Sequence, residues 1–275
     1  MKIWEALIYG LVAGLTGLLP VSFSGHAAVL QDAFALSPLT QGGGLYVRAA
    51  ITLGLSAALV LAFPGELQLT CGELARRPQR GKRARQPSPR RRAVLMGLLA
   101  LPIGLLSLIW CAAAERITRL SLIAAFFCLN GLILFAAGRP GGQKDARALM
   151  LPDALLACAT RLAAVLPGLS PLGLTLAVCR LRDLRTDFAL RFSAMLTLGF
   201  SLCEWLYRLL RAVIVGTFSA SLWLPMLVAL VASTVAGYFA LQYLKYLLHR
   251  EKLRVFSYYC WDAAVIALIL ALINA

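Results

Sequence analysis

Charged residues are scarce in this sequence of 275 residues. Asp, Glu, Lys and Arg make up 14% of the chain, whereas roughly 25% is usual in soluble domains. Hydrophobic residues account for 60%, and the mean hydropathy is +0.80. This composition excludes a soluble globular enzyme and a disordered chain. Because the apolar stretches do not alternate with polar residues, it also argues against an outer-membrane barrel and favours a polytopic α-helical membrane protein.

Clustered metal ligands and paired cysteines are also missing. The sequence has two histidines and seven cysteines, and no two cysteines have the C-x-x-C spacing of a zinc or redox site. Most of the cysteines lie inside apolar segments. We therefore interpret them as small buried apolar residues rather than as metal ligands or a disulfide framework.

Acidic residues number 12 against 27 Lys and Arg, which gives a formal net charge of +15. Nine of the basic residues fall within the seventeen positions of Arg76–Arg92, with no acidic residue among them. By the positive-inside rule, this segment is predicted to be a cytoplasmic loop that touches anionic lipid headgroups. The sequence contains no module that reads nucleic acid, so nucleic acid is not expected as a partner.

The apolar residues form about eight runs long enough to cross, or nearly cross, a bilayer. We expect the first run to be retained in the membrane rather than cleaved as a signal peptide, since it lacks a clear small-residue cleavage site. The runs are Trp4–Leu19, Leu45–Phe63, Ala93–Ala114, Leu120–Ala137, Leu151–Leu166, Phe188–Leu210, Leu222–Leu248 and Val255–Ile273. Two further apolar pieces, Ala27–Leu36 and Leu172–Val178, are too short to span.

Each short piece follows a proline that ends a longer apolar run. Pro20 and Pro167 lie 147 residues apart, about half the chain, and both are followed by Ser and Gly. Broken hydrophobic segments at matching places in two halves are typical of inverted repeats around a central site. We therefore predict one membrane domain, residues 1–275, with half-repeats of roughly 1–137 and 150–275. The alternative is two ordinary helix–loop–helix joints at the membrane surface.

The residues around these prolines resemble two motifs of the undecaprenyl-diphosphate phosphatase family, also called bacitracin-resistance proteins. Gly14–His26 is similar to the first motif, E-G-x-T-E-F-L-P-V-S-S-T-G-H, and Pro167–Gly173 is similar to the second, P-G-x-S-R-S-G. The length of the chain and the separation of the two motifs are also similar to those of the family, so the resemblance covers nearly the whole chain. It implies an all-α polytopic membrane protein, an inverted-repeat helical bundle whose two re-entrant hairpins meet at a cavity.

The resemblance also implies a function. The family renews the lipid carrier of peptidoglycan biosynthesis by hydrolysing undecaprenyl diphosphate to the monophosphate. A polyprenyl phosphate or diphosphate is therefore the implied partner, and the bacterial plasma membrane is the implied location. Nothing in the sequence predicts the oligomeric state.

The chain departs from the family at the residues that carry the chemistry. The two motif glutamates fall on Ala13 and Gly17, and the serine proposed as the nucleophile falls on Phe23. The diphosphate-binding arginine falls on Pro171, and the serine after it falls on Leu172. The family's carboxylates can hold Mg²⁺ or Ca²⁺, so we expect that metal site to be lost. No other cofactor is evident, and hydrolysis is expected to be impaired.

Other motif residues are retained, and they supply the candidate site. His26 is the candidate catalytic residue; its alternative role is that of a hydrogen-bonded structural histidine. The candidate substrate-binding residues are those whose hydroxyl or backbone N–H groups could meet phosphate oxygens. They are Ser22, Ser24, Gly25, Ser170, Gly173 and Thr175.

Three ionisable residues in or near apolar runs are candidate cavity charges, because charge inside a membrane is by default functional. Glu204 could instead pair with Arg208 one helical turn on, and Asp262 could likewise be a structural residue. Arg161 could supply a cation to the cavity or extend to a lipid headgroup. Arg48 lies near a position where the family carries an acid; it could recruit an anion or mark the end of its span.

Two functions remain open from the sequence. The first is the family's hydrolysis of undecaprenyl diphosphate. The second is non-enzymatic binding or translocation of a polyprenyl-phosphate lipid or another amphiphile, which the missing glutamate, serine and arginine residues favour.

Overall fold

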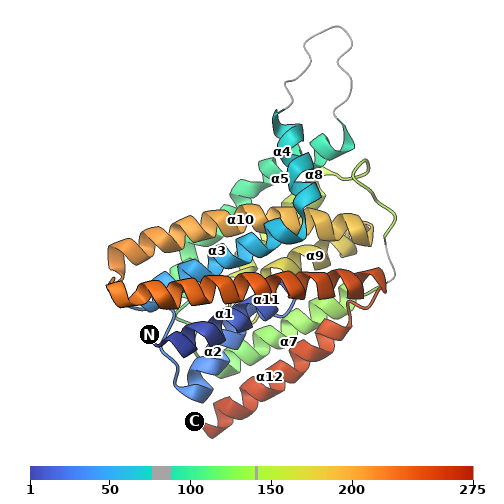
Figure 1. Cartoon of the computed structure of the whole chain (residues 1–275). Coiled ribbons are helices and arrows are strands. Elements are labelled where there is room, and N and C mark those ends of the chain that lie inside the picture. The colour runs from blue at the N-terminus through green and yellow to red at the C-terminus, as the bar shows by residue number, and fades with distance from the viewer. Residues whose placement is uncertain (76–87, 140–141, 275) are drawn as a thin grey trace.

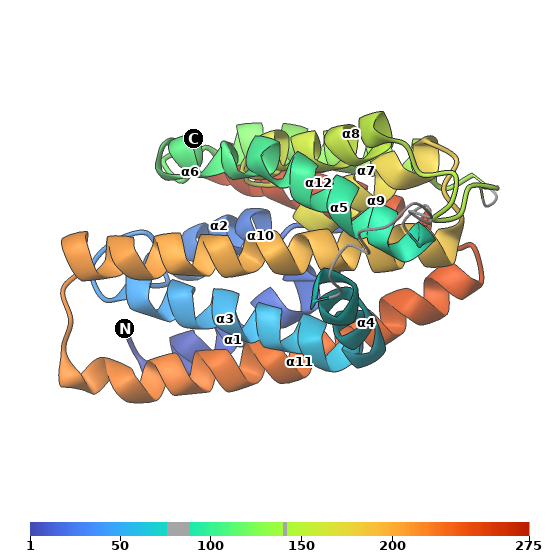
Figure 2. The ribbon, with the colours of Figure 1, turned by 90° about the horizontal axis from the view of Figure 1, so that it is seen from above.

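The computed structural model is all-helical over the residues that it describes, which are 1–75, 88–139 and 142–274. The long helices lie side by side in one bundle (Figures 1 and 2). Most of the predicted basic loop Arg76–Arg92 falls on residues 76–87 and so lies outside the described residues. Its last residues, Arg90–Arg92, form the first turn of a helix.

The helices follow one another with short connections. Their bounds are α1 Ile3–Gly17, α2 Phe23–Phe34, α3 Gly44–Ala62, α4 Pro64–Ala75, α5 Pro89–Leu105, α6 Ser107–Ala114, α7 Leu120–Ala137, α8 Leu151–Ala164, α9 Pro171–Leu181, α10 Thr186–Val215, the 3₁₀ turn η1 Ala220–Leu222, α11 Trp223–His249 and α12 Val255–Ile273.

Four of the described helices are long and apolar enough to cross a membrane: α3, α7, α11 with η1, and α12. The outer face of the bundle carries large apolar side chains, for example Ile109 of α6, Ile214 of α10 and Leu272 of α12, which are each more than 70% exposed. Apolar surface of this extent indicates contact with a membrane. The prediction of a polytopic α-helical membrane protein is confirmed.

Four of the predicted apolar runs are not single spans in the structure. Trp4–Leu19 and Leu151–Leu166 form the shorter helices α1 and α8. The run Ala93–Ala114 is not one straight helix, because α5 and α6 are bent by 41° at Leu106. Pro102 lies one turn before the bend; it lacks a backbone N–H and its ring crowds the preceding turn. The run Phe188–Leu210 lies in α10, which has 30 residues but is not among the apolar spans. Its charged residues lower its hydropathy.

Small residues allow the helices to approach closely. A Cβ added to Gly14 of α1 would lie 2.5 Å from the Cβ of Ala236 and 2.8 Å from the carbonyl oxygen of Ser233, both in α11. Close helix packing through small residues is usual in membranes, where the hydrophobic effect does not press helices together. Helix α11 also packs against α3, and α3 packs against α10.

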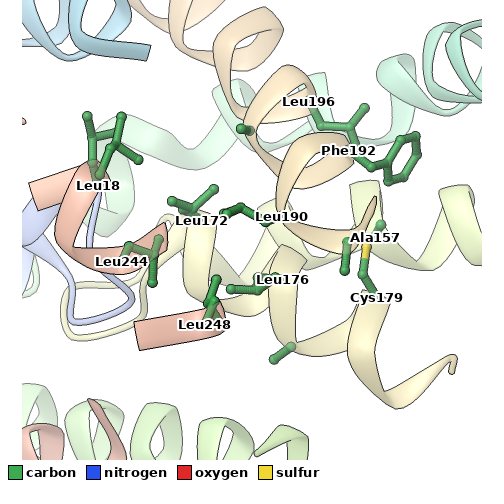
Figure 3. Close-up of a cluster of buried hydrophobic side chains, with 14 of the residues drawn as sticks. Leu18, Ala157, Leu172, Leu176, Cys179, Leu190, Phe192, Leu196, Leu244 and Leu248 are labelled. Atoms are coloured by element: carbon green, nitrogen blue, oxygen red, sulfur yellow. The ribbon is translucent and has the colours of Figure 1, made fainter. Parts of the chain in front are cut away.

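The largest buried cluster joins α9, α10 and α11 (Figure 3). Leu172 and Leu176 of α9 lie near Leu190 of α10, and Leu244 and Leu248 of α11 lie beside them. This cluster surrounds the short helix α9, which cannot span the membrane by itself. The core therefore fixes the position of the loop that precedes α9.

The two proline loops meet inside the bundle. Residues 18–22 connect α1 to α2 and residues 165–170 connect α8 to α9, and both Pro20 and Pro167 are buried. The loops are thus not surface joints far from each other. Symmetry between the half-repeats 1–137 and 150–275 stays a prediction.

Candidate functional site

Two serines cap the helices that follow the proline loops. Ser22 precedes α2, and its Oγ accepts hydrogen bonds from the backbone N–H of Gly25 at 3.4 Å and of Gly168 at 3.1 Å. Ser170 precedes α9, and its Oγ accepts from the N–H of Gly173 at 3.1 Å. Side-chain oxygens at this position satisfy free N–H groups of a first helical turn. The bond from Gly168 to Ser22 also ties one loop to the other.

Three further hydrogen bonds hold the two loops together. Ser170 donates from Oγ to the carbonyl of Leu19 at 3.2 Å. Asn130, buried in α7, donates to the carbonyl of Pro20 at 2.9 Å and accepts from the N–H of Ser170 at 3.0 Å. Sequence reasoning missed Asn130, although a lone amide in an apolar span is a signal for a polar contact inside the bundle.

Two glycines allow the loops to touch. A Cβ on Gly25 would lie 2.9 Å from Cα of Gly168, and a Cβ on Gly173 would lie 2.7 Å from Cβ of Pro20. Gly168 also has φ +106°, a conformation that side chains disfavour. These retained motif glycines therefore serve close contact between the loops.

His26, in α2, lies beside this joint, and its ring faces α12. Its Nδ1 is 2.6 Å from the carbonyl of Ser22 and its Nε2 is 2.9 Å from the hydroxyl of Tyr259. The carbonyl can only accept, so Nδ1 carries a proton, and in the neutral ring Nε2 accepts from Tyr259. The ring edge packs on Phe127, with centroids 5.1 Å apart. His26 does not line either of the cavities described below.

Of the six predicted substrate-binding residues, only Ser24 lines a cavity. Thr175 donates to the carbonyl of Pro171 at 2.9 Å and lies 3.2 Å from the hydroxyl of Thr160. Ser22, Gly25, Ser170 and Gly173 form the joint between the loops. The structure thus brings the motif residues together but uses most of them to hold the loops in place.

The main cavity has a volume of about 110 Å³, enough for several water molecules. It lies where the proline loops meet α3, α6 and α10. Three of the positions at which the sequence departs from the family motifs, Gly17, Phe23 and Pro171, line it, whereas Ala13 is buried elsewhere. Its polar and charged lining residues are Ser24, Arg48, Thr52, Ser107, Cys111, Glu115, Arg161, Thr197, Ser201, Glu204 and Arg208.

Glu204 and Arg208 of α10 begin a chain of ion pairs in this cavity. Arg208 contacts Glu204 at 2.6 Å and Glu115, which follows α6, also at 2.6 Å. Arg161 of α8 contacts Glu204 at 3.2 Å, and Arg48 of α3 contacts Glu115 at 3.2 Å. Arg211 also pairs with Glu115. We call these six residues the arginine–glutamate cluster.

The arginine–glutamate cluster carries four positive and two negative charges, a net charge of +2. The side chains of Arg161 and Arg208 are less than 10% exposed. Buried charge without a partner is costly, and each guanidinium offers five donors in a fixed fork. The cavity is therefore suited to an anion with several oxygen atoms.

The predicted cavity charges have different positions. Arg161 and Glu204 line the cavity, and Glu204 also forms the expected pair with Arg208. Asp262 is exposed on α12 and lines neither cavity. Sequence reasoning missed Glu115, which lies at the end of a broken span and meets α10 about 90 residues further along the chain.

A smaller cavity of about 60 Å³ adjoins the main one. The two share Phe23, Ser24, Arg48, Glu115 and Val165 in their walls. Its other polar lining residues are Gln31, Thr40 and Thr118. The charged cavity therefore continues between α2 and the start of α3.

The residues of the cavity do not fit a divalent cation. Among the described residues, no three of His, Cys, Asp and Glu are grouped so that they could hold a metal ion. Glu115 and Glu204 are the carboxylates of the cavity, and both are bound by arginines. A net positive charge disfavours a further cation.

The fold and this cavity define a multi-pass membrane protein with a buried, positively charged chamber between two helix-breaking loops. The family model described as bacitracin resistance protein BacA matches residues 6–266. The chain therefore belongs to this family.

Several curated relatives are similar to the chain over its full length. One from Carboxydothermus hydrogenoformans is 31% identical and covers 98% of both chains. One from Methanobrevibacter smithii is 30% identical over 97% of this chain and 96% of the relative. One from Kineococcus radiotolerans is 30% identical over 100% of this chain and 96% of its own length. All three are named undecaprenyl-diphosphatase.

Proposed function

We propose that the chain binds the phosphorylated headgroup of a polyprenyl carrier lipid in the main cavity, and that it hydrolyses the diphosphate slowly or not at all. The observation that carries the proposal is the arginine–glutamate cluster, whose net charge of +2 lies beside the joint of the two motif loops. Arginine is suited to phosphate because its planar fork can donate two parallel hydrogen bonds.

The names of the relatives support undecaprenyl phosphate or diphosphate as the lipid. The resemblance of the two motifs to this family implies a role in recycling this carrier for peptidoglycan synthesis. The basic residues Arg90–Arg92 at the start of α5 are suited to contact with anionic membrane lipids.

Impaired hydrolysis follows from the side chains at three cavity positions. Phe23 cannot act as a nucleophile, Pro171 cannot clamp a phosphate, and Gly17 cannot ligate a metal. Removing a single electrostatic donor from an active site costs roughly 10²–10³ in rate. The losses need not multiply, since residues acting as one unit are not additive.

The test measures binding and hydrolysis separately on purified protein in lipid nanodiscs. Binding of undecaprenyl monophosphate and diphosphate should be detectable without divalent metal. Phosphate release from the diphosphate should be far slower than by a relative that keeps the motif glutamates, with or without Mg²⁺ or Ca²⁺. Absence of binding would overturn the proposal, and rapid metal-dependent turnover would overturn the claim of impaired hydrolysis.

Arg161→Gln is the most informative variant, because Arg161 contacts only one carboxylate of the cluster, Glu204. Loss of a charge-assisted hydrogen bond of about 1.5–3 kcal/mol should weaken binding roughly tenfold or more. Arg191→Gln is the matched control. Arg191 belongs to α10 but pairs with Glu66 outside the cavity, and its side chain is half exposed. This control should leave binding unchanged.

A further inference from the structure

Glu115 is held by more arginines than any other carboxylate of the cavity. Arg48 and Arg208 both contact its Oε1, and Arg211 contacts its Oε2. Its side chain is 5% exposed. The carboxylate is thus a fixed anion attached to the protein, and it engages guanidinium groups of the kind that bind phosphate.

The balance of charge decides which headgroup fits the cavity. A phosphate monoester carries about −1.5 to −2 charges near pH 7, which matches the cluster's net +2. A diphosphate adds a second phosphoryl group and further negative charge. To bind the diphosphate equally well, the cavity would need one more unpaired positive charge. In the structure, the carboxylate of Glu115 neutralises one arginine charge of the cluster.

We propose that Glu115 gives the cavity a preference for a lipid monophosphate over the corresponding diphosphate. This inference rests on the proposed binding function and specifies its ligand. The carboxylate of Glu115 competes with the second phosphoryl group for Arg48 and Arg208, which both line the cavity. Glu204 has the same effect on Arg161, although its side chain is more exposed.

A neutral donor supports the binding of a single phosphoryl group. The hydroxyl of Thr197 is buried and has no hydrogen-bond partner among the described residues, and Thr197 lines the cavity. An unpaired buried hydroxyl is unfavourable. Ser24 and Ser201 add further hydroxyls to the wall. The cavity volume of about 110 Å³ is also small.

The test compares dissociation constants of undecaprenyl monophosphate and undecaprenyl diphosphate, without metal, for wild type and Glu115→Gln. Glutamine keeps the shape and removes the charge. We expect the wild type to bind the monophosphate more tightly. In the variant, the ratio of the two constants should move toward the diphosphate by about tenfold, the effect of one charge-assisted contact.

Glu66→Gln is the matched control, because it removes the same charge from a pair with Arg191. Arg191 lies seventeen residues before Arg208 in α10, about 25 Å along the helix. The double variant Glu115→Gln, Arg211→Gln restores a net charge of +2 and should restore the wild-type ratio. It also keeps the test available if the single variant does not fold.

The outcomes separate the two proposals. If the wild type binds neither lipid, the proposed function itself is wrong. If it binds both but prefers the diphosphate, or if the ratio is the same in wild type and Glu115→Gln, the binding function stands and the role of Glu115 is wrong. A shift of the ratio in Glu66→Gln as large as that in Glu115→Gln would also overturn this role, because the effect would then reflect overall charge.

Discussion

The backbone N–H of Gly168 donates a hydrogen bond to Oγ of Ser22 at 3.1 Å, and 146 residues separate the two. The same oxygen caps α2. The Ser22 hydroxyl therefore caps the helix that follows the first proline loop and also binds the backbone of the second loop. Both groups are buried, so neither can turn to water if the other is lost.

Replacing Ser22 by Ala should destabilise the protein. The variant leaves the buried N–H of Gly168 without a partner, at about 1–3 kcal/mol, and also removes a helix cap. Thermal unfolding of the purified protein would measure the change. Ser24→Ala is the comparison, since Ser24 lines the cavity and, among the described residues, its hydroxyl contacts only Oγ of Ser22, at 3.3 Å. It leaves both backbone N–H groups paired and should lower the melting temperature much less. Equal losses in both variants would contradict the assigned role of Ser22.

Replacing Gly25 by Ala should also destabilise the protein. The new Cβ would lie 2.5 Å from Cζ of Phe127 and 2.9 Å from the backbone of Gly168. Overpacking of this kind costs typically about 1–3 kcal/mol. Gly65 of α4 has open space around it, so Gly65→Ala should be neutral or slightly stabilising. Similar melting temperatures for the two variants would show that the loops can separate.

Replacing His26 by Ala should lower stability but leave lipid binding nearly unchanged. The ring contacts Ser22 and Tyr259 rather than the cavity. The dissociation constant should therefore change by much less than the roughly tenfold expected for a lost charge-assisted contact. Tyr259→Phe removes only the hydroxyl partner and should show a smaller version of the same loss in stability. A large loss of binding in His26→Ala would contradict the structural role and place His26 at the ligand.

Glu251, between α11 and α12, should contribute to stability in a pH-dependent way. Burial alone would raise the pKa of this carboxyl, but hydrogen bonds from Arg180 and Thr186 and the charge of Arg180 outweigh it and lower the pKa below its usual 4.5. A lowered pKa gives stability that is present above pH 4.5 and is lost as pH falls through the folded-state pKa. The melting temperature of Glu251→Gln should therefore lack this part of the acid dependence. An unchanged acid profile in the variant would contradict it.

The sequence predicted the features that depend on local composition. Uninterrupted apolar runs identified α3, α7, α11 and α12 as spans, because length and hydropathy suffice for that. The proline–serine–glycine patterns located both loops. The bend at Leu106 was not predicted, because Pro102 lies within a run that otherwise reads as one span.

The arrangement of the candidate site depended on contacts that no local pattern contains. Whether His26 faces the cavity or α12 depends on how α2 is rotated about its axis. Glu115 directly follows α6 and meets Arg48, Arg208 and Arg211 only because α3 and α10 lie beside it. Pairing within a helix was easier to predict, since Glu204 and Arg208 lie one turn apart.

Four of the six residues of the arginine–glutamate cluster, Arg48, Glu115, Arg161 and Arg211, lie within four residues of a helix end. Arg48 is four residues from the start of α3, and Glu115 directly follows α6. With α5 and α6 taken as one bent span, Glu115 and the basic residues Arg90–Arg92 stand at opposite ends. If the basic end faces the cytoplasm, as the positive-inside rule predicts, the cavity belongs to the outer half of the bilayer. A carrier lipid would then meet these arginines from the outer leaflet, and lipid delivered to the inner leaflet would first have to change sides.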